Sequence, residues 1–267
     1  MVETKVAGLI GFGALGTVAG AALKREGYRV MAYDPSPAAQ VEMKSLGVDV
    51  AAGPAEVGRA CDVVAVFVLD ADQARAVLLG PDGVFGAMSK GVVLLQSTVG
   101  PEAARDIAGR CPVGITFFDA PVTVRRSTPP TFFCLIAGAQ APDPAIRKLL
   151  DSYCHDMAFV GPVGAGQAAK LVNNVMSIVN TAVATEALQL ADAFGIDRET
   201  MIRLASNGSG SSHALSTWDI RKTLFEGVPA DDSRITSKKD LSAALQSAGA
   251  AGVQMPMTTR ALDLLVK

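Results

Sequence analysis

The chain has 267 residues, of which 49% are hydrophobic and 19% charged, and 24 basic against 26 acidic residues give a net charge of −2. This composition excludes a disordered or collagen-like chain, and the slightly acidic balance argues against a nucleic-acid-binding protein. A chain of this length buries a large core without disulfides or metal, in one or two domains.

Short β-rich runs alternate with helical stretches over the first part of the chain. Strands are predicted at 6–10, 29–33, 62–69, 92–96, 114–119 and 132–137, and helices at 14–26, 72–79, 102–110 and 144–154. Nearly continuous apolar strands that alternate with helices are typical of an α/β fold, in which helices cover both faces of a mostly parallel sheet.

A glycine-rich stretch over residues 161–166 ends this pattern, and helical periodicity dominates from there on. Helices are predicted at 167–194, 198–206, 212–225 and 238–248, with a last one from about Pro256. We therefore predict two domains, an α/β domain over residues 1–163 and an all-α domain over residues 164–267. Polar and charged residues interrupt the longest helix, which argues against a membrane span.

A glycine-rich turn follows the first strand. Gly11 permits a tight turn, Gly13 lets the backbone approach a diphosphate, and Gly16 lets helix and sheet pack closely. Asp34 ends the second strand, where a carboxylate binds ribose hydroxyls and repels a 2′-phosphate. The pattern predicts NAD, with NADP less favoured. The alternatives are a turn that serves packing alone, and an Asp34 that only forms the turn before Pro35.

Lys170 and Asn174 lie four residues apart on the longest predicted helix, so they share one face, close to where the two domains are expected to meet. A lysine ammonium can donate a proton to a nascent alkoxide, and an amide can orient the lysine or a substrate hydroxyl. From spacing alone, a solvated lysine beside two asparagines is the simpler interpretation.

Four blocks, in order, resemble the β-hydroxyacid dehydrogenase family, which includes 3-hydroxyisobutyrate dehydrogenases and is related to 6-phosphogluconate dehydrogenase. The blocks are residues 8–35, 96–99, 161–174 and 239–241. The resemblance implies a Rossmann-type, doubly wound sheet, a long interdomain helix and an all-α domain that mediates dimers or tetramers.

The resemblance also assigns roles to individual residues. It makes Lys170 the general acid/base and Asn174 its supporting residue, both also in contact with substrate. It places Thr98 near the nicotinamide, Lys239 on the cofactor side of the site, and Leu69 in a cofactor-binding loop. The cofactor turn comprises Gly11, Phe12, Gly13, Ala14, Leu15 and Gly16, with Asp34 beyond it.

The substrate loop departs from the family. Where relatives carry serine and glycines for the substrate carboxylate, this chain has Thr123, Val124, Arg125 and Arg126. Thr123 keeps a hydroxyl, and Val124 and Arg125 keep their N–H groups. The two arginines could clamp an acidic group, or they could be solvated or contact another subunit. Asp70 also replaces a proline of the family, after Leu69.

Together these patterns predict a cytoplasmic NAD(P)-dependent oxidoreductase that acts on a short β-hydroxy acid as a homodimer or homotetramer. We expect a small acidic substrate, no nucleic acid and no membrane partner. Four cysteines without a CxxC pair, and only two histidines, predict free thiols and no metal site. The alternatives are an imine reductase-like enzyme, which usually lacks the lysine, and a non-catalytic NAD(H)-binding regulator.

Overall fold

The computed structural model describes residues 6–125, 128–225 and 232–266. The chain divides into two compact units, and the division falls between Lys170 and Leu171.

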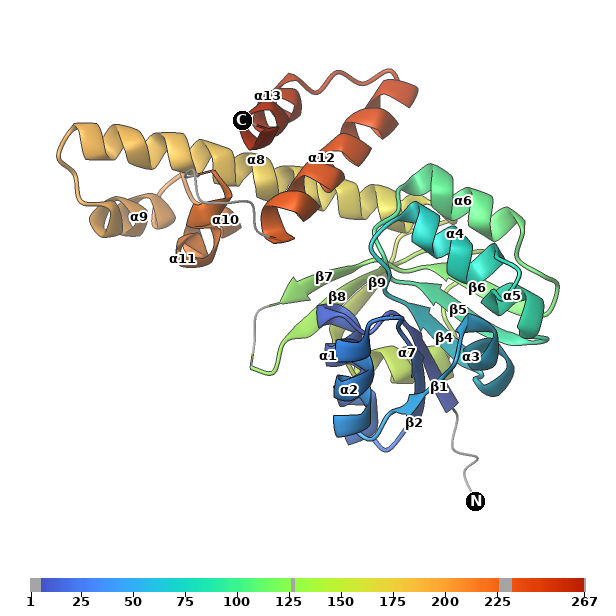
Figure 1. Cartoon of the computed structure of the whole chain (residues 1–267). Coiled ribbons are helices and arrows are strands. Elements are labelled where there is room, and N and C mark those ends of the chain that lie inside the picture. The colour runs from blue at the N-terminus through green and yellow to red at the C-terminus, as the bar shows by residue number, and fades with distance from the viewer. Residues whose placement is uncertain (1–5, 126–127, 226–231, 267) are drawn as a thin grey trace. The chain divides into compact units, whose positions relative to one another are not determined.

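The first unit is built on a six-stranded sheet in the order β3-β2-β1-β4-β5-β6 (Figure 1). Its strands, all parallel, are β1 (Val6–Ile10), β2 (Arg29–Tyr33), β3 (Asp49–Val50), β4 (Val63–Val66), β5 (Gly91–Leu95) and β6 (Ile115–Asp119). This is the strand order of the dinucleotide-binding Rossmann fold, so the predicted fold class is confirmed.

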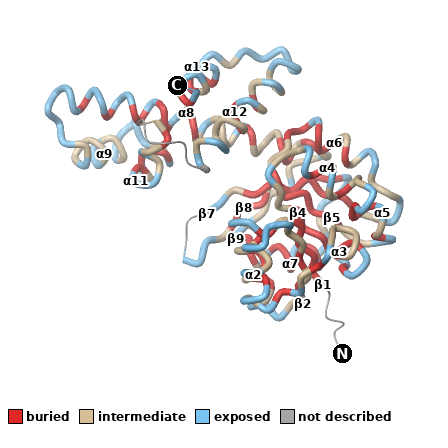
Figure 2. The backbone as a smooth tube through the Cα atoms, viewed as in Figure 1, coloured by how far each residue is buried: buried red, intermediate tan, exposed pale blue. Residues whose placement is uncertain are grey.

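Helices cover both faces of this sheet because side chains alternate along each strand. Along β4, Val63 and Ala65 join one apolar cluster and Val64 and Val66 the other. The first cluster includes residues of α1 (Ala14–Arg25), α2 (Pro37–Ser45) and α7 (Pro144–Asp151). The second includes residues of α3 (Pro54–Ala60), α4 (Ala71–Leu79), α5 (Val84–Ala87) and α6 (Pro101–Gly109). Figure 2 shows the central strands as the buried part of this unit.

A second, three-stranded sheet follows β6. It has the order β7-β8-β9, with β7 (Val122–Arg125) antiparallel and β9 (Cys154–Phe159) parallel to β8 (Thr131–Ile136). The helix predicted over residues 144–154 is therefore too long: α7 ends at Asp151, and Cys154 begins a strand. Pairing with β8 decides this segment, because its own pattern is too irregular to indicate a strand.

Every described element after α8 (Ala165–Ala193) is a helix. They are α9 (Arg198–Ser206), α10 (His213–Ser216), α11 (Trp218–Arg221), a 3₁₀ turn (Lys222–Leu224), α12 (Asp232–Ala250) and α13 (Pro256–Val266). The single helix predicted over residues 212–225 is thus broken at Thr217, whose backbone leaves the helical region and whose hydroxyl donates to the His213 carbonyl at 2.7 Å. Within the described residues, no helix is both long and apolar enough to cross a bilayer.

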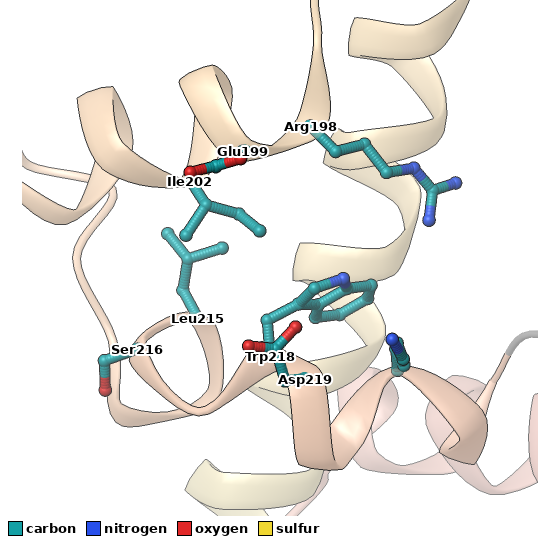
Figure 3. A pocket seen from close by; sticks show the side chains of 8 residues that line it. Arg198, Glu199, Ile202, Leu215, Ser216, Trp218 and Asp219 are labelled. Atoms are coloured by element: carbon teal, nitrogen blue, oxygen red, sulfur yellow. The ribbon is translucent and has the colours of Figure 1, made fainter.

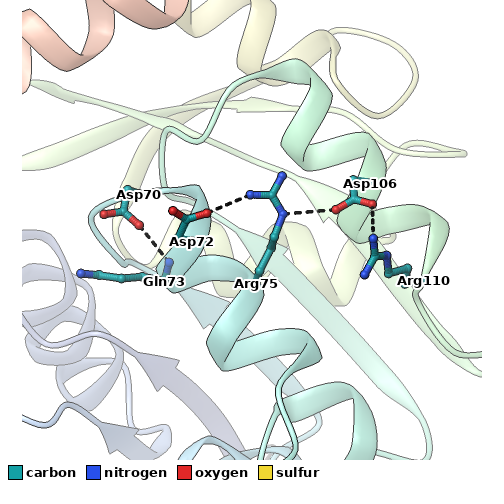
Figure 4. Close-up of polar contacts among 6 residues, drawn as sticks. All are labelled: Asp70, Asp72, Gln73, Arg75, Asp106 and Arg110. Carbon is teal, nitrogen blue, oxygen red and sulfur yellow. Dashed lines mark hydrogen bonds and ion pairs between the residues drawn. The ribbon is translucent and has the colours of Figure 1, made fainter.

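Surface ion pairs join α4 and α6 (Figure 4). Arg75 contacts Asp72 at 3.2 Å within α4 and Asp106 at 3.2 Å on α6, and Arg110 contacts Asp106 at 2.8 Å. The hydrogen bond from Arg75 is the main cause that holds the pKa of Asp106 below its ordinary value, and Arg110 acts in the same direction. Because these groups are exposed, we expect them to fix the helix contact with little effect on stability.

We predict that Arg75→Gln raises the pKa of Asp106 towards its ordinary value and that Arg110→Gln raises it less. A lowered folded-state pKa stabilises the fold above the unfolded-state pKa, and this stabilisation is lost as the pH falls through the folded-state value. A carboxyl ¹³C NMR titration measures both variants, with Arg29→Gln as a control that removes only the separate Arg29–Asp49 pair. An Asp106 pKa unchanged by Arg75→Gln contradicts the assignment.

Candidate functional site

The predicted site residues of the first unit gather at the carboxyl ends of its parallel strands. Gly11 follows β1, Asp34 follows β2, Leu69 lies beyond β4 and Thr98 beyond β5, while Thr123 comes shortly after β6. In open parallel sheets, ligands bind at this edge, next to the point where the strand order reverses. Here that point lies between β1 and β4, beside the glycine-rich turn.

Each glycine of the turn has a distinct reason to be there. Gly11 has φ +89°, and a Cβ atom on it would lie 2.2 Å from the Phe67 carbonyl oxygen. A Cβ on Gly16 would lie 2.2 Å from the Gly11 carbonyl oxygen, so the helix could not pack so closely. A Cβ on Gly13 would meet nothing within 4 Å. Gly13 therefore leaves open space at the start of α1, as a diphosphate requires.

Asp34 is tied to the same turn. Its Oδ2 accepts a hydrogen bond from the Phe12 N–H at 2.7 Å, and its Oδ1 accepts one from the Ser36 N–H at 2.9 Å. The carboxylate thus carries its charge at a fixed place beside the turn. Gly13 caps α1 without a side-chain hydrogen bond, and the first N–H groups of a helix have no partner within it. These features fit a dinucleotide with its diphosphate at α1 and its ribose at Asp34.

The remaining residues of the turn differ in exposure. Phe12 is buried beneath it, Leu15 is half-buried and Ala14 is exposed. Leu69 is also exposed, at 56%, and its N–H donates to Gln73 at 3.0 Å. Asp70, the departure from the family, caps α4 by accepting from the Gln73 N–H at 2.8 Å (Figure 4). Asp70 therefore supplies a helix cap where the family has proline.

Lys170 and Thr123 are brought together. Lys170 is half-buried on α8, and its Nζ donates to the Thr123 Oγ1 at 3.2 Å, across 47 residues of sequence. Thr123 is held in β7 opposite Phe133 of β8. Beside it Val124 is 43% exposed. Arg126 and the side chain of Arg125 lie outside the described residues.

A buried polar pair holds the start of α8. The Asp119 carboxylate, at the end of β6, accepts from the N–H groups of Gly164 at 2.9 Å and Gln167 at 3.1 Å, and from the Gln167 side chain at 2.8 Å. Burial raises the pKa of Asp119, while the hydrogen bonds from Gln167, Gly164 and Gly166 act in the opposite direction. An acceptor at a helix N-terminus satisfies N–H groups and complements the helix dipole.

Two further site residues, Asn174 and Lys239, belong to the second unit. Asn174 Nδ2 donates to Asp240 Oδ2 at 2.7 Å, and Asn174 Oδ1 accepts from Asn173 at 3.1 Å. These bonds fix which way the Asn174 amide points. Lys239 Nζ lies 3.8 Å from the buried Asp240 carboxylate, so Asp240 connects the two residues.

A pocket of about 480 Å³ also lies in the second unit (Figure 3). It is lined by Arg198, Glu199, Ile202, Leu215, Ser216, Trp218, Asp219 and Lys222, none of which the sequence analysis assigned to a site. Two basic and two acidic residues balance its charge, and Arg198 is bound to Asp192 through two nitrogens. The lining favours no charged ligand.

Sequence reasoning missed Ser97, Asp119, Gln167 and Asp240. Ser97 joins two strand ends: its Oγ donates to the Val66 carbonyl at 3.1 Å and accepts from the Val68 N–H at 2.7 Å. The spacing of Gln167, three residues before Lys170, placed it on the lysine's face of the helix and could have drawn attention to it. The chain pattern contained no comparable signal for Asp119, whose partners lie 45 and 48 residues away.

The strand order, the glycine turn and Asp34 together define a dinucleotide-binding protein of the Rossmann class. Residues 6–161 match the family model described as the NAD binding domain of 6-phosphogluconate dehydrogenase, and residues 164–267 match that described as NAD-binding of NADP-dependent 3-hydroxyisobutyrate dehydrogenase. The chain belongs to the β-hydroxyacid dehydrogenase family, so the resemblance seen in the sequence is confirmed, and at family level the chain is an NAD(P)-binding oxidoreductase.

Individual relatives are distant. The chain is 30% identical over 262 residues to 2-(hydroxymethyl)glutarate dehydrogenase of Eubacterium barkeri, covering 96% of this chain and 87% of that protein. It is 28% identical over 239 residues to mouse mitochondrial 3-hydroxyisobutyrate dehydrogenase, covering 87% and 71%. Among solved structures, Mycobacterium tuberculosis 3-hydroxyisobutyrate dehydrogenase with L-serine superposes with a TM-score of 0.85 at 23% identity, covering 99% and 93%. That likeness shows the fold.

The glycine turn gives a paired prediction. Gly11→Ala should destabilise the fold, because the new Cβ meets backbone at 2.2 Å and φ is +89°. Gly13→Ala should leave the melting temperature nearly unchanged yet weaken NADH binding, because its Cβ occupies the space expected for the diphosphate. Thermal unfolding and NADH fluorescence titration measure the two effects. Full NADH affinity in Gly13→Ala would contradict the assigned diphosphate position.

Proposed function

We propose that this protein is an NAD-dependent oxidoreductase that interconverts a short β-hydroxy acid and its semialdehyde or keto form. The observation that carries the proposal is the 3.2 Å contact between Lys170 Nζ and Thr123 Oγ1, at the sheet edge that also carries the glycine turn. A proton-transferring group thereby stands beside a hydroxyl suited to an acid substrate. We assign residues 1–163 to a dinucleotide-binding domain, which also holds Thr123, and residues 164–267 to a helical domain that contributes substrate and oligomer contacts.

The dinucleotide would be held by the turn from Gly11 to Gly16, by Asp34 and by the loop residues Leu69 and Thr98, with Lys239 assisting. A bound nicotinamide supplies the acceptor or donor of hydride. The chain supplies the proton transfer: neutral Lys170 accepts the substrate hydroxyl proton during oxidation, and its ammonium returns a proton to the alkoxide during reduction.

Asn174 orients the reacting groups in this proposal. Its amide direction is set by Asn173 and Asp240, which leaves it a defined partner for the substrate hydroxyl or for Lys170. A side chain already held by hydrogen bonds loses little conformational entropy when substrate arrives. Asn174 therefore acts as a supporting residue to Lys170, one helical turn away on α8.

We propose that the substrate carboxylate binds at the start of β7, through the Thr123 hydroxyl and the N–H groups of Val124 and Arg125. The names of two relatives support an acid with a hydroxyl on its β-carbon, since 3-hydroxyisobutyrate and 2-(hydroxymethyl)glutarate share that arrangement.

We propose a homodimer in the cytoplasm. An apolar stripe of exposed residues runs along α8, at Val172, Met176, Val183 and Leu190, and Phe194 follows directly after the helix. These residues recur on one side of the helix, and an exposed apolar stripe of this kind suits packing against the same surface of a second copy. The four free cysteines suit a reducing compartment.

Sedimentation equilibrium measures the mass of the protein in solution and should give that of two chains. A monomer at micromolar concentration would contradict the dimer.

The position of Asp34 favours NAD over NADP, because its carboxylate repels a 2′-phosphate. Asp34→Ser should lower kcat/KM for NAD and raise the NADP to NAD ratio of kcat/KM by about tenfold or more, as removal of a charge repulsion worth roughly 1.4 kcal/mol would do. Steady-state rates with each cofactor measure the ratio. A wild-type enzyme that prefers NADP would overturn the preference.

The role of Lys170 has a sharp test. Lys170→Met keeps the apolar stem of the side chain, so NADH binding should persist, whereas turnover should fall by roughly two to four decades, the usual contribution of a general acid–base group. Rates are measured by NADH absorbance with C3–C6 hydroxy acids and semialdehydes. Lys148→Met, a change on α7, is the matched control and should keep wild-type rates. Undiminished turnover in Lys170→Met would remove the lysine from the mechanism.

The same substrate panel separates the rival functions. NADH binding without turnover on any acid or semialdehyde would support a non-catalytic regulator and overturn the proposal. Reduction of cyclic imines in preference to carbonyl substrates would support an imine reductase. The presence of a lysine at position 170 favours carbonyl chemistry, because a lysine ammonium suits a developing alkoxide.

A further inference from the structure

The Gln167 side chain is fully committed to four hydrogen bonds. Its Oε1 accepts from the N–H groups of Val99 at 2.8 Å and Gly100 at 3.1 Å. Its Nε2 donates to the Ser97 carbonyl at 3.0 Å and to Asp119 Oδ1 at 2.8 Å. A primary amide has two donors and two acceptor sites, so no capacity is left unused and the amide can take only one orientation.

These bonds enclose Thr98. Gln167 binds the peptide carbonyl before Thr98 and the peptide N–H after it, so the backbone of that residue is held on both sides. Gln167 is itself fully buried. A buried amide in such a place is costly to disturb, because any broken bond leaves a polar group unsatisfied.

The same residue sits three positions before Lys170 on α8, on the side of the helix that carries the lysine. Asp119 holds the first turn of α8 from the end of β6, and β7, with Thr123, begins only three residues after Asp119. Three residues of the proposed site, Thr98, Thr123 and Lys170, are thus all attached to one buried pair.

We propose that Gln167 and Asp119 are positioning residues, which set the place of Lys170 and Thr123 relative to Thr98 and thereby control the chemical step. This rests on the proposed function, in which Lys170 transfers the proton and Thr98 lies beside the nicotinamide. Neither residue needs to touch substrate: each acts through the atoms it holds.

The pattern of donors and acceptors makes the pair testable by exchange. In Gln167→Glu, a carboxylate oxygen replaces Nε2 and faces the Asp119 carboxylate, so two acceptors meet. In Asp119→Asn, an amide group faces either Gln167 Nε2 or the N–H groups at the start of α8, so donors meet. In the double variant Asp119→Asn/Gln167→Glu, the Asn amide can donate to the Glu carboxylate, and only the Ser97 carbonyl loses its donor.

We expect each single variant to lower kcat on the order of 10- to 100-fold, the effect of misplacing a catalytic group by about an ångström. The kcat of the double variant should be at least about tenfold higher than that of the less active single variant, a coupling expected of residues in one network. NADH affinity should change by less than about threefold throughout, since the turn and Asp34 are untouched. Ile146→Val, a core change on α7, controls for lost stability and should keep kcat.

Two kinetic outcomes overturn the proposal. The first is a single variant whose kcat falls no further than that of Ile146→Val. The second is a double variant whose fold-decrease in kcat equals the product of the two single fold-decreases, as for two independent residues. Thermal unfolding accompanies each variant, and Gln167→Met, which keeps the volume and removes all four bonds, replaces Gln167→Glu if that variant does not fold.

A readout without turnover separates this proposal from the proposed function. The ¹³Cε and ¹⁵Nζ NMR shifts of Lys170, assigned with Lys170→Arg, should move in both single variants and return towards wild type in the double variant. Shifts that stay unchanged in the single variants refute the positioning role. A wild type that turns over no substrate refutes the proposed function instead, while the NMR comparison still decides the positioning.

Discussion

The structure of the site depends on one buried carboxylate. Asp119 ends β6 and accepts the N–H groups at the start of α8, and it binds the side chain of Gln167. Burial raises the pKa of Asp119, and the hydrogen bonds from the surrounding donors offset only part of that effect. Because every partner of the carboxylate comes from the start of α8, the charge fixes where this helix begins and therefore where Lys170 stands, one turn further on.

At the same edge of the sheet, backbone groups and side chains have different roles. At the glycine turn the residues lack side chains, so the backbone N–H groups at the start of α1 are open to an anion. Beyond β5 and at the start of α8 it carries polar side chains, Ser97 and Gln167 among them, that bind one strand end to the next. A parallel sheet suits this arrangement because all of its strands end on the same side.

Much of the fold could be predicted from local pattern. The limits of β1, β2 and α9 agree with the prediction residue for residue, because periodicity and end signals such as Asp197, the cap of α9, act locally. The elements α2, α3, α5, β3 and β7 were not predicted. α3, α5, β3 and β7 carry too few residues for a period to be visible, whereas α2, which is as long as α9, buries only Met43 and so lacks a clear apolar stripe. β9 was not predicted, and its first residue, Cys154, was assigned to the end of a helix, because only the partner strand β8 makes this segment a strand.

The sequence by itself determined the alternation of strands and helices, the glycine turn with Asp34, and the presence of a lysine and an asparagine one turn apart. These features depend on residues close together in the chain, whose spacing carries the information. Only the tertiary structure decided that Lys170 meets Thr123, that Gln167 encloses Thr98 and that Asp119 holds α8. Those contacts join residues 45 to 70 positions apart, and their donors and acceptors become partners only when the sheet brings its strand ends together.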